Sequence, residues 1–399
     1  MKYITLEIKD RSFPGGKDIL PQLIKMNTTL PIPEKKSTRL ISIDALRGFD
    51  MLLIAGGGAC IELLEGKTGW AWLDAIAGQL HHPTWNGFTF YDFIFPLFLF
   101  ISGVSLPFSL NKGLESGLSK SDLYKKSFRR MVILILLGIL DKNTPVTFFD
   151  PANIRIASVL GRLGIASFVT TVLYLNFSTY RRLIWVAAIL LCYYAAFFLI
   201  PVPGYGAGDL SFQGNLAGWV DRTFLPGRLL QKTFDELGLL TQVSALCLCI
   251  MGSVGGDVLR KQWTNNKRLL WLTVAGVSAI GLGLLWSLHF PINKHMWTSS
   301  FILLTGGMSF LAVALSYLLI DVWQFKKASF FFYVVGMNSL TVYLMYRFID
   351  FTYSSRMLFS GIYAPAPERF HKSLEALGAL IIIWSLLYFL YRKKIFIKI

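Results

Sequence analysis

Long apolar runs, separated by short polar and basic connections, dominate the pattern of this chain. A run of about 20 apolar residues suffices to cross a bilayer of about 30 Å as a helix. Such runs recur along the whole sequence and predict about ten membrane-spanning helices. The expected spans are 43–64, 88–109, 131–148, 155–176, 183–200, 239–256, 269–289, 298–320, 328–347 and 374–391. The pattern therefore predicts an all-α integral membrane protein.

The segments outside these spans are polar. Residues 1–39 are basic and contain several prolines, but no apolar core of signal-peptide length, so we expect a flexible cytoplasmic tail. Residues 40–399 are expected to form the transmembrane domain. Short helical pieces are expected in two longer connections: an amphipathic one within 65–87 that lies at the interface, and one around 222–237.

Composition supports the membrane assignment. Hydrophobic residues make up 54% of the chain and charged residues only 16%, whereas soluble domains carry about 25% charged residues. The net charge of +16 is of the kind found in nucleic-acid-binding proteins. Here, however, the basic residues stand in short runs between apolar segments, which is a topology signal and not a phosphate-binding face. We therefore expect the lipid bilayer as a partner and no nucleic acid.

The distribution of basic residues among the loops predicts the orientation of the bundle in the membrane. Basic loops at 111–130, 181–182, 260–268 and 326–327, together with the C-terminal end, fall on one side of the predicted bundle. Basic loops stay in the cytoplasm, so both termini are expected to be cytoplasmic. The connection that contains His82 then faces outward.

His82 is the strongest candidate for chemistry. It precedes Trp85 and Asn86 in a polar turn, and the apolar run behind this turn contains one early carboxylate, Asp92. Imidazole titrates near neutral pH and suits proton transfer, although an interfacial polar anchor is the alternative reading. None of the five histidines shows the spacing of a zinc site, so no metal is expected.

Charges inside other predicted spans are further candidates. Asp44 and Arg47 stand three positions apart at the start of the first span, where they can pair on one helix face or bind a ligand. Arg162 lies about two turns inside a span and needs an anionic partner. One candidate partner is an aspartate, which is Asp44, Asp50 or Asp92. The other is an anionic ligand, because a guanidinium binds carboxylate and phosphate groups well.

The ninth span contains an amide and a hydroxyl side chain, Asn338 and Ser339. Interhelical hydrogen bonding is one reading of such groups and ligand binding is the other. Intramembrane charge with helix-breaking Gly and Pro also fits a sugar or glycan-fragment permease. From the residues alone, an enzyme, a permease and a non-catalytic membrane partner in glycan assembly all remain open.

Five ordered segments resemble motifs of the heparan-α-glucosaminide N-acetyltransferase family. They are residues 42–48 (SIDALRG), 82–101 (HPTWNGFTFYDFIFPLFLFI), 155–164 (RIASVLGRLG), 291–297 (PINKHMW) and 336–339 (GMNS). The resemblance implies a multi-helix acetyltransferase that moves an acetyl group from cytoplasmic acetyl-CoA to an amino sugar or glycan on the periplasmic or lumenal face. The expected partners are acetyl-CoA, this acceptor and the bilayer, with a homodimer as one assembly to test. The expected location is a bacterial inner membrane.

The resemblance also implies roles for single residues. The active histidine of the family maps onto His82, which we expect to act as the general base. The further catalytic residues expected are Asp44, Arg162 and Asn338, and those expected to bind acetyl-CoA or the acceptor are Arg47, Trp85, Asn86, Asp92 and Ser339. The lysosomal member has an Asn before the glycines of the first span that assists the histidine, and this chain reads Ile54-Ala55-Gly56 there. The partner of His82 is therefore not evident from the sequence.

Overall fold

The structure is a computed structural model that describes residues 40–143 and 150–397, so the predicted tail 1–39 lies outside the described residues. Within the described ranges the chain is helical, and its β pairing is limited to two isolated bridges. The α-helices are α1 (Ile41–Leu52), α2 (Ala59–Glu62), α3 (Ala71–Gly78), α4 (Phe90–Glu115), α5 (Lys120–Lys142), α6 (Val159–Asn176), α7 (Thr179–Leu199), α8 (Leu216–Phe224), α9 (Leu239–Arg260), α10 (Asn265–Ser287), α11 (Ser299–Ser316), α12 (Lys326–Met337), α13 (Ser339–Phe348), α14 (Phe351–Tyr363) and α15 (His371–Arg392).

Seven helical segments of the described chain are long and apolar enough to cross a membrane. An eighth is added if α12 and α13, which are bent by 64° at Asn338, are taken as one broken span. The predicted class of all-α integral membrane protein is confirmed. The number of ten spans stays a prediction, because the first span is interrupted and α5 is rich in charge.

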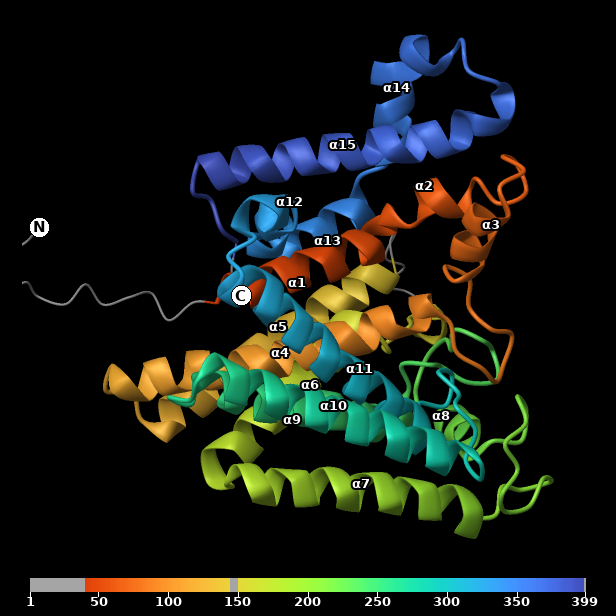
Figure 1. Cartoon of the computed structure of the whole chain (residues 1–399). Helices are drawn as coiled ribbons and strands as arrows, with labels where there is room; N and C mark the ends of the chain where they lie inside the picture. The colour runs from red at the N-terminus through yellow and green to blue at the C-terminus, as the bar shows by residue number, and fades with distance from the viewer. Residues whose placement is uncertain (1–39, 144–149, 398–399) are drawn as a thin grey trace, which may run out of the picture. The chain divides into compact units, whose positions relative to one another are not determined.

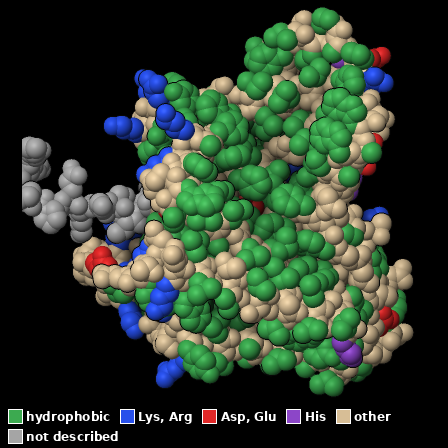
Figure 2. Space-filling model, viewed as in Figure 1, with side chains coloured by type: hydrophobic (Ala, Val, Ile, Leu, Met, Phe, Trp, Pro, Cys, Tyr) green, Lys and Arg blue, Asp and Glu red, His purple; other side chains and the backbone are tan. Residues whose placement is uncertain are grey.

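The long helices run side by side, with α4 and α9 packed against each other inside the bundle (Figure 1). The α4–α5 and α9–α10 connections lie at one end, and α3 and α8 lie at the other. Figure 2 shows blue Lys and Arg side chains gathered at the first of these ends. The bundle is therefore polarised, as the distribution of basic loops predicts.

Glycines let some helix pairs touch backbone to backbone. A Cβ atom on Gly48 of α1 would lie 1.8 Å from the carbonyl oxygen of Phe332, and one on Gly336 of α12 would lie 1.8 Å from that of Asp44. In the same way, a Cβ atom on Gly103 of α4 would lie 2.0 Å from the carbonyl oxygen of Cys249 in α9. Close crossings of this kind are the usual role of small residues in membrane helices.

Two of the predicted spans are broken. The first is interrupted by a π-helical turn, η1 (Leu53–Gly57), in which Gly56 has a φ of 81° that favours glycine. The ninth breaks at Asn338, between α12 and α13. Breaks inside a membrane span leave backbone groups that other parts of the protein must satisfy.

Several predicted element boundaries are wrong. The loop expected at 111–130 is mostly helical, because Ser119 and Asp122 form a capping box that starts α5 at Lys120. Arg155 lies outside its expected span, since α6 begins only at Val159 behind the N-cap Ser158.

The short helix expected around 222–237 is also misplaced. It is α8, Leu216–Phe224, and it starts where the Asn215 side chain accepts a hydrogen bond from the Gly218 N–H. A further helix, α14, was not expected; it is capped by the side chain of Asp350.

Candidate active site

His82 lies in the turn between α3 and α4 and contacts the first turn of α4. Its Nδ1 lies 2.7 Å from Oδ1 of Asp92. The other carboxylate oxygen of Asp92 accepts the Thr89 N–H at 3.0 Å, which completes a capping box. The Asp92 side chain is 1% exposed, whereas the His82 side chain is 42% exposed. An imidazole that donates from Nδ1 to a carboxylate presents the lone pair of Nε2 to a substrate.

Lys294, from the connection between α10 and α11, joins this pair. Its Nζ lies 3.1 Å from each ring nitrogen of His82 and 3.3 Å from Oδ1 of Asp92. Burial lowers the pKa of Lys294, although the negative charge of Asp92 opposes the shift. The site thus brings together an imidazole, a buried carboxylate and a primary amine from segments that are far apart in the sequence.

The same connection fixes the turn that carries His82. The side-chain amide of Asn293 donates to the carbonyl oxygen of Trp85 and to Oδ1 of Asn86, both at 3.0 Å. The Gly87 N–H donates to the carbonyl oxygen of Ile292 at 3.0 Å. Trp85 and Asn86, which we expected to bind substrate, therefore hold the two connections together.

A second histidine–carboxylate pair, which the sequence did not predict, lies beside the first. Nδ1 of His295 lies 2.7 Å from Oε1 of Glu236, and the His295 ring stacks on Trp85 at 5.4 Å between centroids. Burial alone would raise the pKa of Glu236, but the hydrogen bond and charge of His295, with the charge of Lys294, lower it to about 2. The one available signal was that His295 lies within the motif at 291–297.

The loop that carries Glu236 is fixed by a buried ion pair. Arg155 donates from Nε and Nη2 to the two carboxylate oxygens of Asp235, at 2.7 and 2.8 Å. The Asp235 side chain is 0% exposed and also accepts the Leu230 N–H at 3.0 Å. A bidentate Arg–carboxylate pair fixes orientation as well as distance.

Arg162 is buried close to this loop. Its Nη2 donates to Oγ1 of Thr241 at 2.5 Å, and its guanidinium lies 4.5 Å from the ring centroid of Trp297. In the described ranges it forms no ion pair with any of the three expected aspartates, and its Nε and Nη1 have no hydrogen-bond partner. The prediction of a carboxylate partner is therefore not met, whereas the prediction that Arg162 binds an anionic ligand remains.

Asp44 and Arg47 lie in the first turns of α1. This helix begins at the end of the bundle opposite α3 and α8 (Figure 1). They form the expected pair, with Nη1 of Arg47 3.4 Å from Oδ1 of Asp44. Nη2 of Arg47 also donates to Oγ of Ser105 at 2.5 Å. The positive charges of Arg130 and Arg47 repel each other. The buried Nε of Arg130 has no hydrogen-bond partner in the described residues.

Asn338 contacts the C-terminal segment and not the His82 turn. Its side-chain amide donates to the carbonyl oxygen of Ile395, and its oxygen accepts the Ile397 N–H, both at 3.1 Å. Ser339 is the first residue of α13 and is half-buried. These contacts favour a structural role for Asn338 at the helix break, and its predicted catalytic role stays untested.

Residues 39–206 match the family model described as heparan-alpha-glucosaminide N-acetyltransferase, catalytic. This range contains His82 and Asp92, as well as Arg47 and Arg162. The chain resembles this acetyltransferase family. The resemblance that the sequence motifs indicated is confirmed.

Two similar relatives carry the same description over most of this chain. The human heparan-alpha-glucosaminide N-acetyltransferase is 26% identical over 451 aligned residues, which cover 98% of this chain and 63% of the human protein. The mouse protein is 26% identical over 424 aligned residues, which cover 91% of this chain and 61% of its own length. The chain thus spans less than two thirds of the length of the relatives that it matches. Among the described residues, no group of three or more His, Cys, Asp or Glu side chains is arranged to hold a metal ion.

Proposed function

We propose that this protein is an acyltransferase that moves an acetyl group from acetyl-CoA to an amino sugar or glycan at the outer face of a membrane. The observation that carries the proposal is the 2.7 Å contact between His82 and Asp92, because both residues lie in the range that matches the catalytic family model. The family match also favours this activity over the permease.

The pair supports general base catalysis. Neutral His82 accepts a proton at Nε2 from the acceptor amine or hydroxyl as that group attacks the thioester carbonyl carbon. The C–S bond then breaks, and the imidazolium returns the proton to the departing thiolate. The Asp92 carboxylate accepts the hydrogen bond from Nδ1 and stabilises the imidazolium while it exists. Direct transfer of this kind is favoured over an acetyl-histidine intermediate.

Lys294 and Arg162 have complementary roles in this scheme. The primary amine of Lys294 lies 3.1 Å from Nε2 of His82. We place the amine of the acceptor at the same position during attack. Two buried guanidinium nitrogens of Arg162, Nε and Nη1, have no hydrogen-bond partner in the described chain. We assign these groups to the oxyanion of the tetrahedral intermediate, since charge that develops in a buried site is stabilised by donors already in place.

The opposite end of the bundle is suited to the phosphates of acetyl-CoA. The positive charges of Arg47 and Arg130 repel each other at that end. A bound phosphate would relieve this repulsion. Lys and Arg side chains gather at the same end (Figure 2). By the positive-inside rule we place this end, and both termini, in the cytoplasm. A bacterial inner membrane is the location that we propose.

The experiment is acetyl transfer from labelled acetyl-CoA to a panel of amino sugars and glycan fragments by the purified protein. The proposal predicts a labelled acceptor in at least one case and thermal stabilisation of the protein by acetyl-CoA. Uptake of labelled sugar into vesicles without acetyl-CoA, together with no transfer to any acceptor, would support the permease and contradict the proposal.

A further inference from the structure

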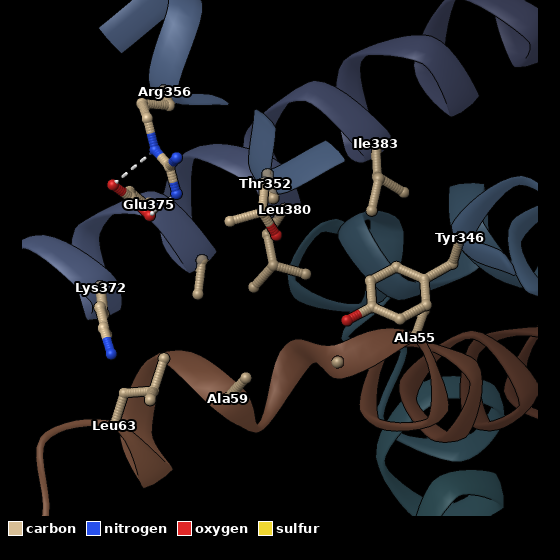
Figure 3. A pocket seen from close by; sticks show the side chains of 13 residues that line it. Ala55, Ala59, Leu63, Tyr346, Thr352, Arg356, Lys372, Glu375, Leu380 and Ile383 are labelled. Atoms are coloured by element: carbon tan, nitrogen blue, oxygen red, sulfur yellow. Dashed lines mark hydrogen bonds and ion pairs between the residues drawn. The ribbon is translucent and has the colours of Figure 1, made fainter. Parts of the chain in front are cut away.

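A cavity of about 290 Å³ lies between α15 and the broken first span. Small side chains leave this space open, among them Ala55 and Ala59 on one wall and Ala379 on the other. Tyr346 of α13 closes the inner end, where its hydroxyl points into the cavity beside Gly56 (Figure 3). The volume is near the lower limit of small-molecule pockets, about 300 Å³, so the cavity has room for one head-group-sized part of a ligand.

The polarity of the cavity changes along α15. Lys372 and Glu375 line it in the first turns of this helix, and Arg356 of α14 reaches Glu375 through two contacts of 3.1 Å (Figure 3). Leu380 and Ile383 line it further along the helix. One end is therefore charged and the other apolar, which is the polarity of a membrane lipid with its head group at the interface.

The charged end carries a net positive charge. Glu375 neutralises Arg356, whereas Lys372 forms no ion pair with any residue that the structure describes. An anionic group is the complement of this arrangement, and a basic residue near a membrane surface attracts anionic lipids.

The helices around the cavity expose apolar side chains. Only 28% of the 18-residue apolar stretch in the span Glu368–Arg392, which contains α15, is buried within the protein. The side chains of Met357 and Ile362 in α14 are 67% and 76% exposed. Green apolar side chains cover both sides of the hollow between this part of the molecule and the rest of the bundle (Figure 2). A lipid thus has lateral access to the cavity from the bilayer.

We propose that this cavity is a binding site for an anionic lipid of the outer leaflet, with the head group at Lys372 and the first part of an acyl chain beside Leu380 and Ile383. The cavity wall is tied to the His82 turn, because Glu62 of α2 lies 3.6 Å from Nδ1 of His81. A lipid bound here lies next to the wall of the proposed acetyl-acceptor site. The binding itself does not depend on acyl transfer.

The test is native mass spectrometry of the full chain after reconstitution in nanodiscs of phosphatidylglycerol and phosphatidylcholine. The wild-type protein should retain phosphatidylglycerol preferentially. Lys372→Gln should weaken this retention about fivefold, the effect of roughly 1 kcal/mol for one basic residue near a membrane surface. Ala379→Phe, which fills the cavity, should abolish the preference.

Matched controls separate the cavity from the general lipid surface. Lys120→Gln removes an exposed charge at the other end, and Ile381→Phe enlarges a lipid-facing side chain of α15 that is 51% exposed. Both should behave like the wild type. Equal retention of the two lipids by the wild type, or an equal loss in Lys372→Gln and Lys120→Gln, would overturn the proposal. Displacement of phosphatidylglycerol by equimolar glycerol phosphate would also overturn it, because the ligand would then be a soluble anion.

Discussion

Nδ1 of His82 lies 2.7 Å from Oδ1 of Asp92, ten positions further along the chain. The contact forms because the polar turn after His82 folds back onto the first turn of α4, where Thr89 and Asp92 cap the helix. This carboxylate gives His82 a buried partner that the sequence alone did not make evident. Asp92 is therefore better placed to orient the histidine than to bind a substrate directly.

The first prediction concerns this carboxylate. Asp92→Asn should lower kcat about 10²–10⁴-fold, the usual contribution of general acid–base catalysis, because the imidazolium loses its stabilising charge. The affinity for acetyl-CoA should not change. Steady-state kinetics with a direct binding measurement test this prediction, and a kcat within twofold of the wild type would contradict it.

The second prediction concerns the ion pair of Arg155 and Asp235. Arg155→Ala should lower the free energy of unfolding by about 3–5 kcal/mol, because it leaves a buried carboxylate without its partner. Arg356→Ala is the matched control, since Arg356 also donates from Nε and Nη2 to the two oxygens of Glu375, at 3.1 Å each, but its side chain is 59% exposed. That variant should lose at most about 1 kcal/mol. Denaturant titration in detergent micelles measures both, and equal losses would show that the burial of Arg155 has no energetic consequence.

The third prediction concerns pH. Burial raises the pKa of Asp221 to about 6, although it accepts the N–H groups of Asp235 and Leu239. The unfolded chain should show the usual value of about 3.9. The raised folded value means that the contribution of this group to stability is complete below about pH 3.9 and is lost as the pH rises through about 6. The melting temperature of the wild type should therefore fall over this interval relative to that of Asp221→Asn. Parallel curves for the two proteins would refute this assignment.

The sequence predicted the components of the site better than their arrangement. His82 and Asp92 both stood out as polar groups at the mouth of an apolar run, but their pairing depends on the fold of the turn between them. Lys294 and Glu236 were missed as site residues because they lie more than 150 positions from His82, in loops whose contacts no local pattern predicts. Asn338 was given a catalytic role from its motif, whereas its amide contacts the C-terminal backbone.

The helical class was predictable because apolar length alone determines it. The helix boundaries were less predictable. The capping box at Ser119 that extends α5 and the break at Gly56 depend on single residues. An average of hydrophobicity over about 20 residues does not detect such local features.

The most direct test of the account compares two neighbouring histidines. Nε2 of His81 lies 2.6 Å from Oε2 of Glu65 in an exposed contact, whereas His82 contacts the buried Asp92. His82→Gln should abolish acetyl transfer while the protein still binds acetyl-CoA and remains folded, and His81→Gln should retain transfer. Full transfer activity in His82→Gln would contradict the assignment of His82 as the general base.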